Sequence, residues 1–395
     1  MSTHGNTATN PSPSALFQPL RLGTMDLQNR LVLAPLTRFR ADDEHVPVPE
    51  RMAPYYAQRG CVPGTLLITE GTFVDQRAAG YGNVPGIWND AQIAAWKPIT
   101  EAVHKNGSYV YCQLWAMGRA ANPAYLKSRG LKAVSSSAKA MPANEKEARP
   151  TEGETPEELS EQGIKEFIEY FARGARNAVA AGFDGVEIHA ANGYLIDQFT
   201  QDVVNQRTDA WGGSVEKRAR FAIEIAKACV DAVGADKVGI RLSPFSTFQG
   251  MKMEAKALHE QFSYLVTELR KLKLSYLHLV ESRISGSADG EETGEKVSFL
   301  TDIWQAGEGA TPVLLAGGFT PESAKRCVDE EFKGKEVGVV FGRYWISTPD
   351  LVYRIQKGIE LTPYDRKTFY VPKDTKGYND YPYSKEFEQE FGAKI

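Results

Sequence analysis

The segment Gly185-Val-Glu-Ile-His-Ala-Ala-Asn-Gly-Tyr-Leu-Ile-Asp-Gln-Phe199 combines an apolar run with a polar end. The run that ends at Ile188 predicts a short buried strand, and His189 stands where the chain would leave the sheet. Asn192 and Tyr194 follow directly. Three side chains that can donate hydrogen bonds are therefore expected at one strand end. Such a group can hold an oxygen that becomes negative during a reaction and can supply a proton beside it.

The same strand pattern recurs along the chain. Near-continuous apolar runs are typical of strands that are buried on both faces of a parallel sheet. The predicted strands are Leu31–Leu36, Gly64–Glu70, Tyr109–Trp115, Gly185–His189, Val238–Ser243, Tyr276–Glu281, Val313–Gly317 and Val337–Phe341. Sequences with helical spacing separate most of them: Ala91–His104, Ser160–Ala181, Ser214–Val233, Glu254–Leu272, Pro321–Glu331 and Pro349–Lys357, with shorter links at Glu50–Gln58 and Thr301–Gly307.

Strands that alternate with helices in this way predict an α/β fold, a (β/α)8 TIM barrel. A doubly wound sheet also alternates, but no G-x-G-x-x-G follows the first strand. We expect a flexible N-terminal arm over residues 1–14 and a single barrel domain over residues 15–395. Long insertions follow the third strand (Ala116–Glu158) and the sixth (Ser282–Lys296). They are predicted to be lids or pocket walls on the catalytic face, with tolerated surface loops as the alternative.

Composition narrows the class of protein. Of 395 residues, 42% are hydrophobic and 24% charged, which is typical of a soluble globular enzyme. A net charge of -4 argues against a nucleic-acid partner. No apolar run is long enough to span a membrane, and the first residues do not resemble a secretory signal, so we expect a cytoplasmic protein. The four cysteines are isolated and no His/Cys spacing resembles a metal site, so no metal is expected.

The predicted strand ends are rich in hydrogen-bond donors. A TIM barrel builds its active site from the carboxyl ends of its strands and the loops that follow them. At the last two ends, Ala316-Gly-Gly318 and Phe341-Gly-Arg343 combine glycine with a cation, as in barrel phosphate sites. The alternative is that these glycines only permit tight turns. Arg241, within an apolar strand, needs an anionic partner or an electron-rich ring, and the Gln113 amide suits the edge of a heterocycle. These residues permit a flavin but do not require one.

Several motifs, in the same order, resemble those of the old yellow enzymes. These are flavin-dependent ene-reductases of the NADPH dehydrogenase and 12-oxophytodienoate reductase type. The matching pieces are Asn29-Arg-Leu-Val-Leu-Ala-Pro-Leu-Thr-Arg38, Thr69-Glu-Gly71, Gln113-Leu-Trp115, His189-Ala-Ala-Asn-Gly-Tyr194, Arg207-Thr-Asp-Ala-Trp-Gly-Gly-Ser-Val-Glu-Lys-Arg218, Leu315-Ala-Gly-Gly318 and Phe341-Gly-Arg-Tyr344. The resemblance covers nearly the whole chain and is greatest to fungal members.

The resemblance implies a noncovalent FMN in the barrel mouth, NADPH as reductant and small activated alkenes as substrates, in a monomer or homodimer. The implied contacts of the flavin ring are Pro35, Thr37, Gly71, Gln113 and Arg241, and those of the phosphate are Gly318, Gly342 and Arg343. By the same resemblance the catalytic residues are His189 and Asn192, which bind the substrate oxygen, and Tyr194, which donates the proton. Trp115, Phe299 and Tyr378 are implied to line the substrate pocket.

The implied reaction reduces the flavin with NAD(P)H and then passes hydride to the β-carbon of an α,β-unsaturated carbonyl or nitroalkene, while Tyr194 protonates the α-carbon. One alternative keeps the fold but makes the protein a dedicated secondary-metabolism reductase or isomerase, for example for an unsaturated aldehyde of ergot alkaloid synthesis. A TIM-barrel glycosidase is an alternative of another class, with Glu70 and Glu281 as its carboxylate pair. A noncatalytic flavin-binding protein is a third.

Overall fold

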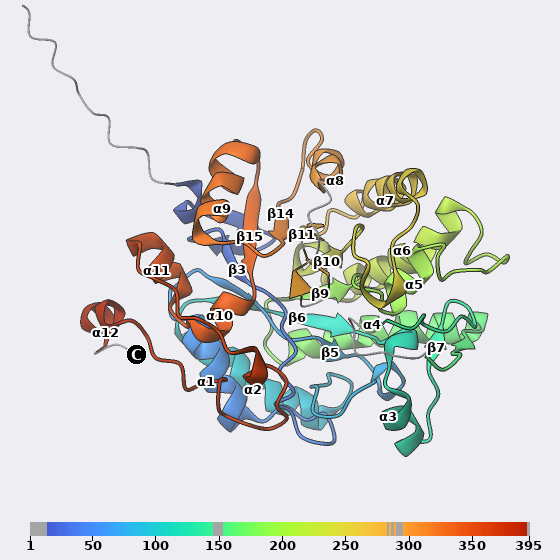
Figure 1. The fold of residues 1–395 in the computed structure, drawn as a ribbon, viewed down its shortest axis with the longest axis horizontal. Helices are drawn as coiled ribbons and strands as arrows, with labels where there is room; N and C mark the ends of the chain where they lie inside the picture. The colour runs from blue at the N-terminus through green and yellow to red at the C-terminus, as the bar shows by residue number, and fades with distance from the viewer. Residues whose placement is uncertain (1–13, 145–152, 283, 286–287, 290–294, 393–395) are drawn as a thin grey trace, which may run out of the picture.

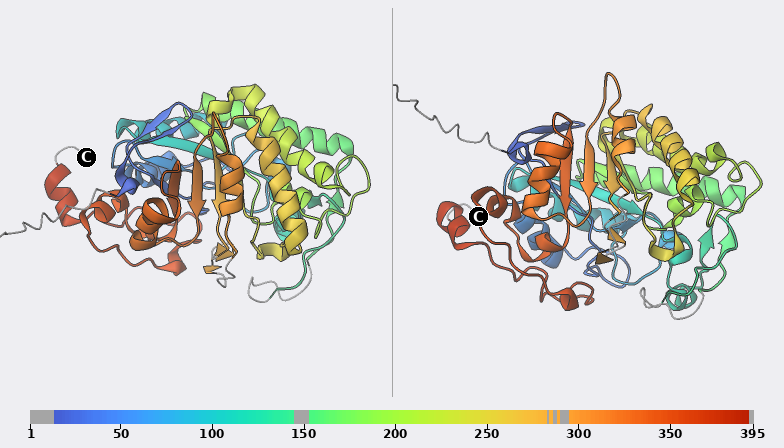
Figure 2. Two further views of the ribbon diagram at one scale, coloured as in Figure 1. Left: turned by 90° about the horizontal axis from the view of Figure 1, so that it is seen from above. Right: turned by 45° about the horizontal axis from the view of Figure 1, so that its top comes forward.

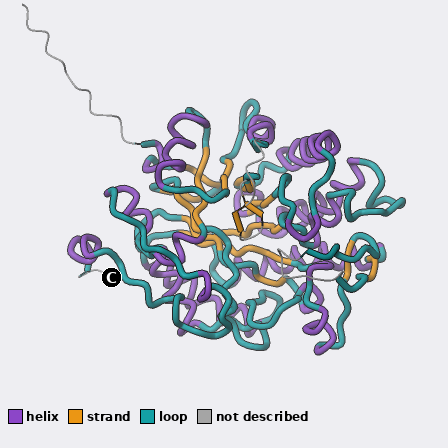
Figure 3. The backbone as a smooth tube through the Cα atoms, viewed as in Figure 1, coloured by secondary structure: helices purple, strands orange, loops and turns teal. Residues whose placement is uncertain are grey.

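A ring of eight parallel strands lies at the centre of the computed structural model (Figures 1 and 3). The structure describes residues 14–144, 153–282, 284–285, 288–289 and 295–392. The barrel strands are β3 (Leu31–Leu33), β4 (Leu66–Ile68), β6 (Tyr109–Trp115), β9 (Gly185–His189), β10 (Val238–Leu242), β11 (Tyr276–Val280), β14 (Val313–Ala316) and β15 (Val337–Phe341). Each pairs with its two neighbours, and β4 pairs with both β3 and β6, so the sheet closes. The TIM-barrel prediction is confirmed.

Helices surround the barrel, and Figure 2 shows the longest of them side by side along the outside of the strands. The larger helices are α1 (Pro49–Arg59), α2 (Asp90–Lys105), α4 (Glu161–Ala180), α6 (Val215–Val233), α7 (Ala255–Arg270), α8 (Ser298–Trp304) and α11 (Leu351–Lys357). Shorter ones are α3 (Pro123–Ser128), α5 (Leu195–Thr200), α9 (Pro321–Arg326), α10 (Arg343–Ser347) and α12 (Lys385–Phe391). Side-chain caps fix several starts: Ser160 and Ser214 each accept a hydrogen bond from the third helical N–H of α4 and α6.

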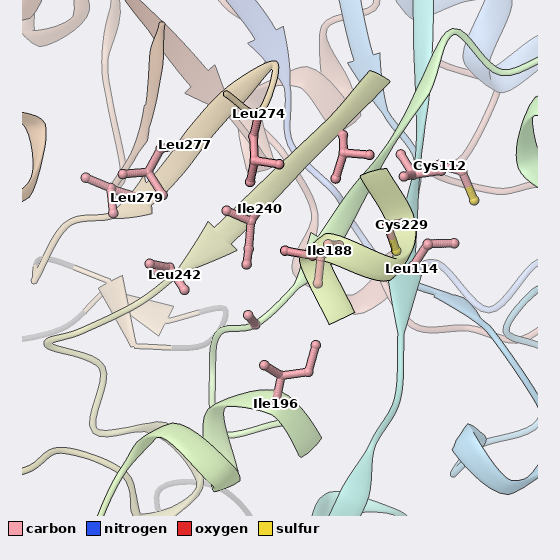
Figure 4. Close-up of a cluster of buried hydrophobic side chains, with 14 of the residues drawn as sticks. Cys112, Leu114, Ile188, Ile196, Cys229, Ile240, Leu242, Leu274, Leu277 and Leu279 are labelled. Carbon is pink, nitrogen blue, oxygen red and sulfur yellow. The ribbon is translucent and has the colours of Figure 1, made fainter. Parts of the chain in front are cut away.

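Alternation along the strands decides which side chains enter the barrel. Successive strand residues point to opposite faces, so every second one faces the helices. Leu114, Ile188 and Ile240 lie in this outer layer, which Figure 4 shows in close-up. The residues between them therefore point inward, and on β6, β9, β10 and β11 they include the polar side chains of Gln113, Glu187, Arg241 and His278. Strand register sets Gln113 opposite Glu187, and Arg241 between His189 and His278.

An amino-terminal hairpin, which the hydrophobic pattern of the sequence does not predict, closes one end of the barrel. Strands β1 (Leu20–Leu22) and β2 (Met25–Leu27) pair antiparallel around a turn at Gly23, whose φ is +50°. Their buried side chains join the same apolar cluster as the inward-facing Val32 and Tyr276. The hairpin therefore plugs the end opposite the strand carboxyl termini and leaves the other end for chemistry.

The first insertion packs against the segment that follows Tyr194. It contains α3 and the short strand β7 (Val134–Ser135), which pairs with β8 (Glu157–Glu158). Hydroxyl groups of Ser135 and Ser136 donate to the side-chain and main-chain oxygens of Gln198 in α5. This supports the pocket-wall interpretation.

Other predicted segments are less fully described. The second insertion carries a hairpin of β12 (Ile284–Ser285) and β13 (Ala288–Asp289), and the rest of it lies largely outside the described residues. The predicted arm, apart from Ser14, also lies outside them. Within the described chain, no helix combines the length and apolar character needed to cross a membrane.

Candidate functional site

Three predicted site residues meet at the carboxyl ends of β6 and β9. The Trp115 indole lies nearly parallel to the His189 ring, with centroids 5.9 Å apart. Tyr194 stands edge-on to both rings, 4.8 Å from Trp115 and 4.9 Å from His189. Trp115 and His189 are almost fully buried. The rings therefore fix one another by packing, and the tyrosine hydroxyl is not needed to hold the ring in place.

The turn between His189 and Tyr194 is held by buried polar groups. Asn192 has a left-handed φ of 58°, and its N–H donates to Ser243 Oγ at 2.7 Å. Side chains of α5 bind both main-chain polar groups of Gly193. The Gly193 N–H donates to Asp197 Oδ2 at 2.9 Å, and the Gly193 carbonyl accepts from Gln198 Nε2 at 2.7 Å. The Asn192 side-chain amide makes no hydrogen bond with the described residues. It is therefore available to a ligand.

The protonation of His189 follows from its surroundings. Burial, reinforced by the nearby charge of Arg241, holds the pKa of His189 well below its usual range, so the ring is neutral. Nδ1 accepts a long hydrogen bond, 3.4 Å, from the Ala191 N–H. This contact assigns the proton to Nε2. No described residue accepts from that Nε2–H, so it can donate to a bound oxygen next to the Asn192 amide.

Tyr194 is an acid that keeps its proton. Burial raises the pKa of its hydroxyl, and the neighbouring Tyr81 and Tyr370 raise it further. The site thus offers a neutral imidazole donor, an amide donor and an undissociated phenol on one loop. This arrangement can stabilise an oxyanion and protonate a carbon beside it.

Gln113 and Arg241 point into the barrel next to this cluster. The Arg241 guanidinium makes one hydrogen bond within the described chain, 3.4 Å from Nε to His278 Nε2, so its other donors are free. Pro35 and Thr37 follow β3 and are partly exposed. A Cβ on Gly71 would lie 2.5 Å from the Trp115 ring, so only glycine fits there. These residues suit a planar, electron-rich group.

The predicted phosphate residues lie at the ends of two paired strands, β14 and β15. Gly318 has a left-handed φ of 64°. Within the described residues, the main-chain N–H groups of Gly318 and Gly342 have no hydrogen-bond acceptor. Arg343 is partly exposed and lies over the Tyr364 ring at 5.6 Å. Free N–H donors beside a cation fit a phosphate.

Tyr378 and Phe299, which are predicted from the sequence to line the substrate pocket, pack in other parts of the structure, so these two predictions are wrong. Tyr378 is 0% exposed and stacks on Tyr55 at 4.1 Å, within the packed carboxyl-terminal segment. Phe299, in α8, packs on His259 of α7 at 4.2 Å, between two outer helices. The tail residue near Tyr194 is instead Tyr370, which is 48% exposed. The tail that holds Tyr378 has no periodicity, and the side of α8 on which Phe299 lies depends on its contact with α7, so the sequence alone misplaces both.

Glu70, one of the two carboxylates of the glycosidase alternative, is held by buried neighbours. It is 1% exposed, and its carboxylate accepts from the Arg38 N–H and the Tyr56 hydroxyl, at 3.2 and 3.4 Å. Burial raises its pKa to about 7. Its contacts are those of a residue that ties the loop after β3 to α1. No cluster of three or more potential metal ligands occurs among the described residues.

Comparison with known proteins identifies the family. The model of the NADH:flavin oxidoreductase / NADH oxidase family matches residues 15–362. Chanoclavine-I aldehyde reductase fgaOx3 of Penicillium roqueforti is 58% identical over 96% of this chain and 99% of its own. NADP-dependent oxidoreductase lnbE of Aspergillus flavus is 48% identical over 94% and 97%.

Solved structures agree with these matches. The crystal structure of old yellow enzyme from Pichia sp. AKU4542 superposes with a TM-score of 0.84 and 37% identity, over 94% of each chain. The glycosidase alternative is thereby excluded. The chain belongs to the NADH:flavin oxidoreductase / NADH oxidase family, as a flavin oxidoreductase of the old yellow enzyme type.

Proposed function

We propose that the protein is an FMN-dependent ene-reductase that uses NADPH to reduce the C=C bond of an α,β-unsaturated carbonyl compound or nitroalkene. One observation carries this proposal: the free His189 Nε2–H and Asn192 amide lie on the same clamped loop as the protonated Tyr194. Two donors and one acid are what addition of hydride to an activated alkene requires.

The unused guanidinium donors of Arg241 and the main-chain N–H groups of Gly318 and Gly342, which have no acceptor among the described residues, support a noncovalent FMN. Arg241 and Gln113 would meet the ring, with Pro35, Thr37 and Gly71 around it. Gly318, Gly342 and Arg343 would hold the phosphate. When bound, FMN would supply the hydride that is first taken from the nicotinamide. NADPH is the proposed reductant because a relative with 48% identity is named NADP-dependent.

The protein's own residues would bind and polarise the substrate. His189 and Asn192 donate to the carbonyl or nitro oxygen, and both bonds strengthen as negative charge develops on it. Loss of one such donor costs about 2–4 kcal/mol in comparable oxyanion sites. Tyr194 holds its proton until the α-carbon of the substrate becomes basic, because burial disfavours the phenolate.

A second candidate narrows the substrate to an unsaturated aldehyde of ergot-type secondary metabolism, reduced or isomerised by the same residues. The observation in its favour is 58% identity, over nearly both full lengths, to a protein named chanoclavine-I aldehyde reductase. Aromatic side chains near Tyr194 also suit a flat, largely apolar substrate: Phe39 packs edge-on against Tyr81 and Tyr370, with ring centroids 5.9 and 6.0 Å apart.

Product analysis tests both candidates. Purified protein is supplied with FMN, then with NADPH or NADH, and with 2-cyclohexenone, β-nitrostyrene or chanoclavine-I aldehyde in separate reactions. We expect the saturated product, with deuterium at the β-carbon when the reductant carries deuterium at its transferable position. A kcat/KM for the aldehyde far above that for cyclohexenone supports the dedicated role. Failure to reduce any of the three by a protein that carries FMN would overturn the ene-reductase proposal.

A further inference from the structure

One buried carboxylate inside the barrel faces polar side chains of the adjacent strand β6 and of β11, which lies two strands away on the other side. Glu187, in β9, is 0% exposed. Its Oε1 accepts from Gln113 Nε2 of β6 at 2.8 Å. Its Oε2 faces two groups of β11, the Tyr276 hydroxyl at 3.1 Å and His278 Nδ1 at 2.8 Å. None of these contacts involves a residue that binds substrate, so the catalytic scheme leaves the charge of Glu187 unexplained.

The carboxylate is ionised. Burial alone would raise its pKa, but the adjacent His278, Arg241 and the Gln113 hydrogen bond outweigh burial and hold the pKa of Glu187 below its usual value. An ionised carboxylate only accepts hydrogen bonds. Every group that faces it must therefore present a proton.

This requirement fixes the orientation of Gln113. Its NH2 group is turned toward Glu187, so Oε1 is turned the other way. Within the described chain, no donor reaches that Oε1. A glutamine amide can flip at little cost in a symmetric environment, and here the carboxylate excludes the flipped form.

The same requirement reaches Arg241 through His278. Burial holds the pKa of His278 below its usual value, and Arg241 contributes in the same direction, so the ring is neutral with its proton on Nδ1. Nε2 then carries a lone pair and accepts from Arg241 Nε at 3.4 Å. The remaining guanidinium donors have no acceptor among the described residues.

We propose that Glu187 is a positioning residue that sets the hydrogen-bond pattern offered to the pyrimidine edge of the flavin, with Gln113 Oε1 as the acceptor and the Arg241 guanidinium as the donor. That edge carries carbonyl oxygens and a single N–H, at N3, so it needs an acceptor as well as donors. The proposal rests on the proposed function, because it requires FMN to bind here. The proposal goes beyond the proposed function by assigning a role to Glu187, which does not touch the substrate.

The test is Glu187→Gln, which keeps the shape but removes the charge, so that the Gln113 amide and the His278 tautomer are no longer dictated. Apoprotein is titrated with FMN by flavin fluorescence. We expect Kd to rise about 10- to 100-fold, as for loss of one charge-assisted hydrogen bond. FMN labelled with ¹⁵N provides a second readout: the N3–H proton resonance should move upfield in the variant, because its acceptor is no longer fixed.

Tyr276→Phe is the matched control. It removes one donor to Glu187 but keeps the charge, the Gln113 contact and the His278 contact, so the N3–H resonance should stay in place and Kd should change less than about threefold. A purely structural role for Glu187 would lower the melting temperature without moving the N3–H resonance of bound FMN.

Glu187→Asp covers the case in which Glu187→Gln does not fold. It keeps the charge but shortens the side chain, so the contacts at 2.8 Å cannot all persist, and both readouts should still change. FMN affinity and an N3–H resonance equal to those of the parent, in whichever of the two variants folds, would overturn the proposal. Failure of the parent itself to bind FMN would instead overturn the proposed function.

Discussion

Tyr194→Phe separates the proton-donor role of this residue from a role in shaping the pocket. The ring is held by edge-on contacts with Trp115 and His189, at 4.8 and 4.9 Å, and phenylalanine keeps both. The variant loses only the hydroxyl and its hydrogen bond to Gln249. Net loss of one such bond costs about 1 kcal/mol of folding free energy, so the protein should stay folded and bind FMN.

The effect on chemistry should be much larger and confined to one half-reaction. General acid catalysis contributes about 10²- to 10⁴-fold, and the raised pKa of Tyr194 keeps this acid protonated throughout the working pH range. Reduction of the flavin by NADPH requires no proton from Tyr194 and should be unchanged. Reoxidation by 2-cyclohexenone should slow by the stated factor.

Stopped-flow absorbance at the flavin band, with an enone and a nitroalkene as alternative acceptors, measures both half-reactions. The hydride step to β-nitrostyrene should be slowed far less, because the nitronate is stable enough to leave before it is protonated. Equal slowing with both acceptors would show that Tyr194 shapes the pocket and does not supply the proton.

Three further predictions concern the donors to the substrate oxygen, the phosphate site and a buried carboxyl group. His189→Ala and Asn192→Ala should each weaken binding of a phenol and raise the barrier to reoxidation by an enone by about 2–4 kcal/mol, while FMN stays bound. A phenol titration and stopped-flow rates measure both effects. An unchanged oxidative half-reaction in both variants would show that neither residue binds the substrate oxygen. Arg343→Ala should raise the Kd for FMN yet leave the turnover of flavin-loaded protein nearly unaltered; equal FMN affinity in variant and parent would refute its place at the phosphate. Burial raises the pKa of Asp197 from 3.8 to about 7, so the folded protein keeps a proton that the unfolded chain releases, and the free energy of unfolding should fall as pH rises between those values. At about 1.4 kcal/mol per pKa unit, this shift makes up to about 4 kcal/mol of the free energy of unfolding depend on pH, and Asp197→Asn should remove that part of the dependence. Denaturant titrations from pH 4 to 7 measure it, and parallel curves of unfolding free energy against pH for variant and parent would contradict the prediction.

The barrel could be predicted because strand and helix periods are local properties of the sequence. Each barrel strand is a short apolar run, and the polar residues that interrupt it, such as Gln113, Glu187 and Arg241, occupy inward positions because of simple alternation. His189, Asn192 and Tyr194 come together because they share one loop. Strands β1 and β2 are too short, at three residues each, for their alternation to stand out.

Contacts between distant segments could not be predicted. Tyr378 and Tyr370 lie in the same irregular tail, and only packing against Tyr55 places one in the core and leaves the other near Tyr194. Phe299 lies in the first turn of α8, and the direction of its side chain is set by packing against α7 and not by the loop before the helix. The clamp of Gly193 by Asp197 and Gln198 depends on the way α5 turns back under the loop, which the sequence pattern does not reveal.

The most direct test of the central claim is an anaerobic absorbance experiment on the purified protein. After reconstitution with FMN and removal of free cofactor, a flavin spectrum should remain with the protein. NADPH should bleach it, and 2-cyclohexenone or an unsaturated aldehyde, added without oxygen, should restore it with saturated product formed in proportion to the flavin. Protein that retains no flavin, or a flavin that NADPH bleaches and no activated alkene reoxidises, would contradict the assignment as an FMN-dependent ene-reductase.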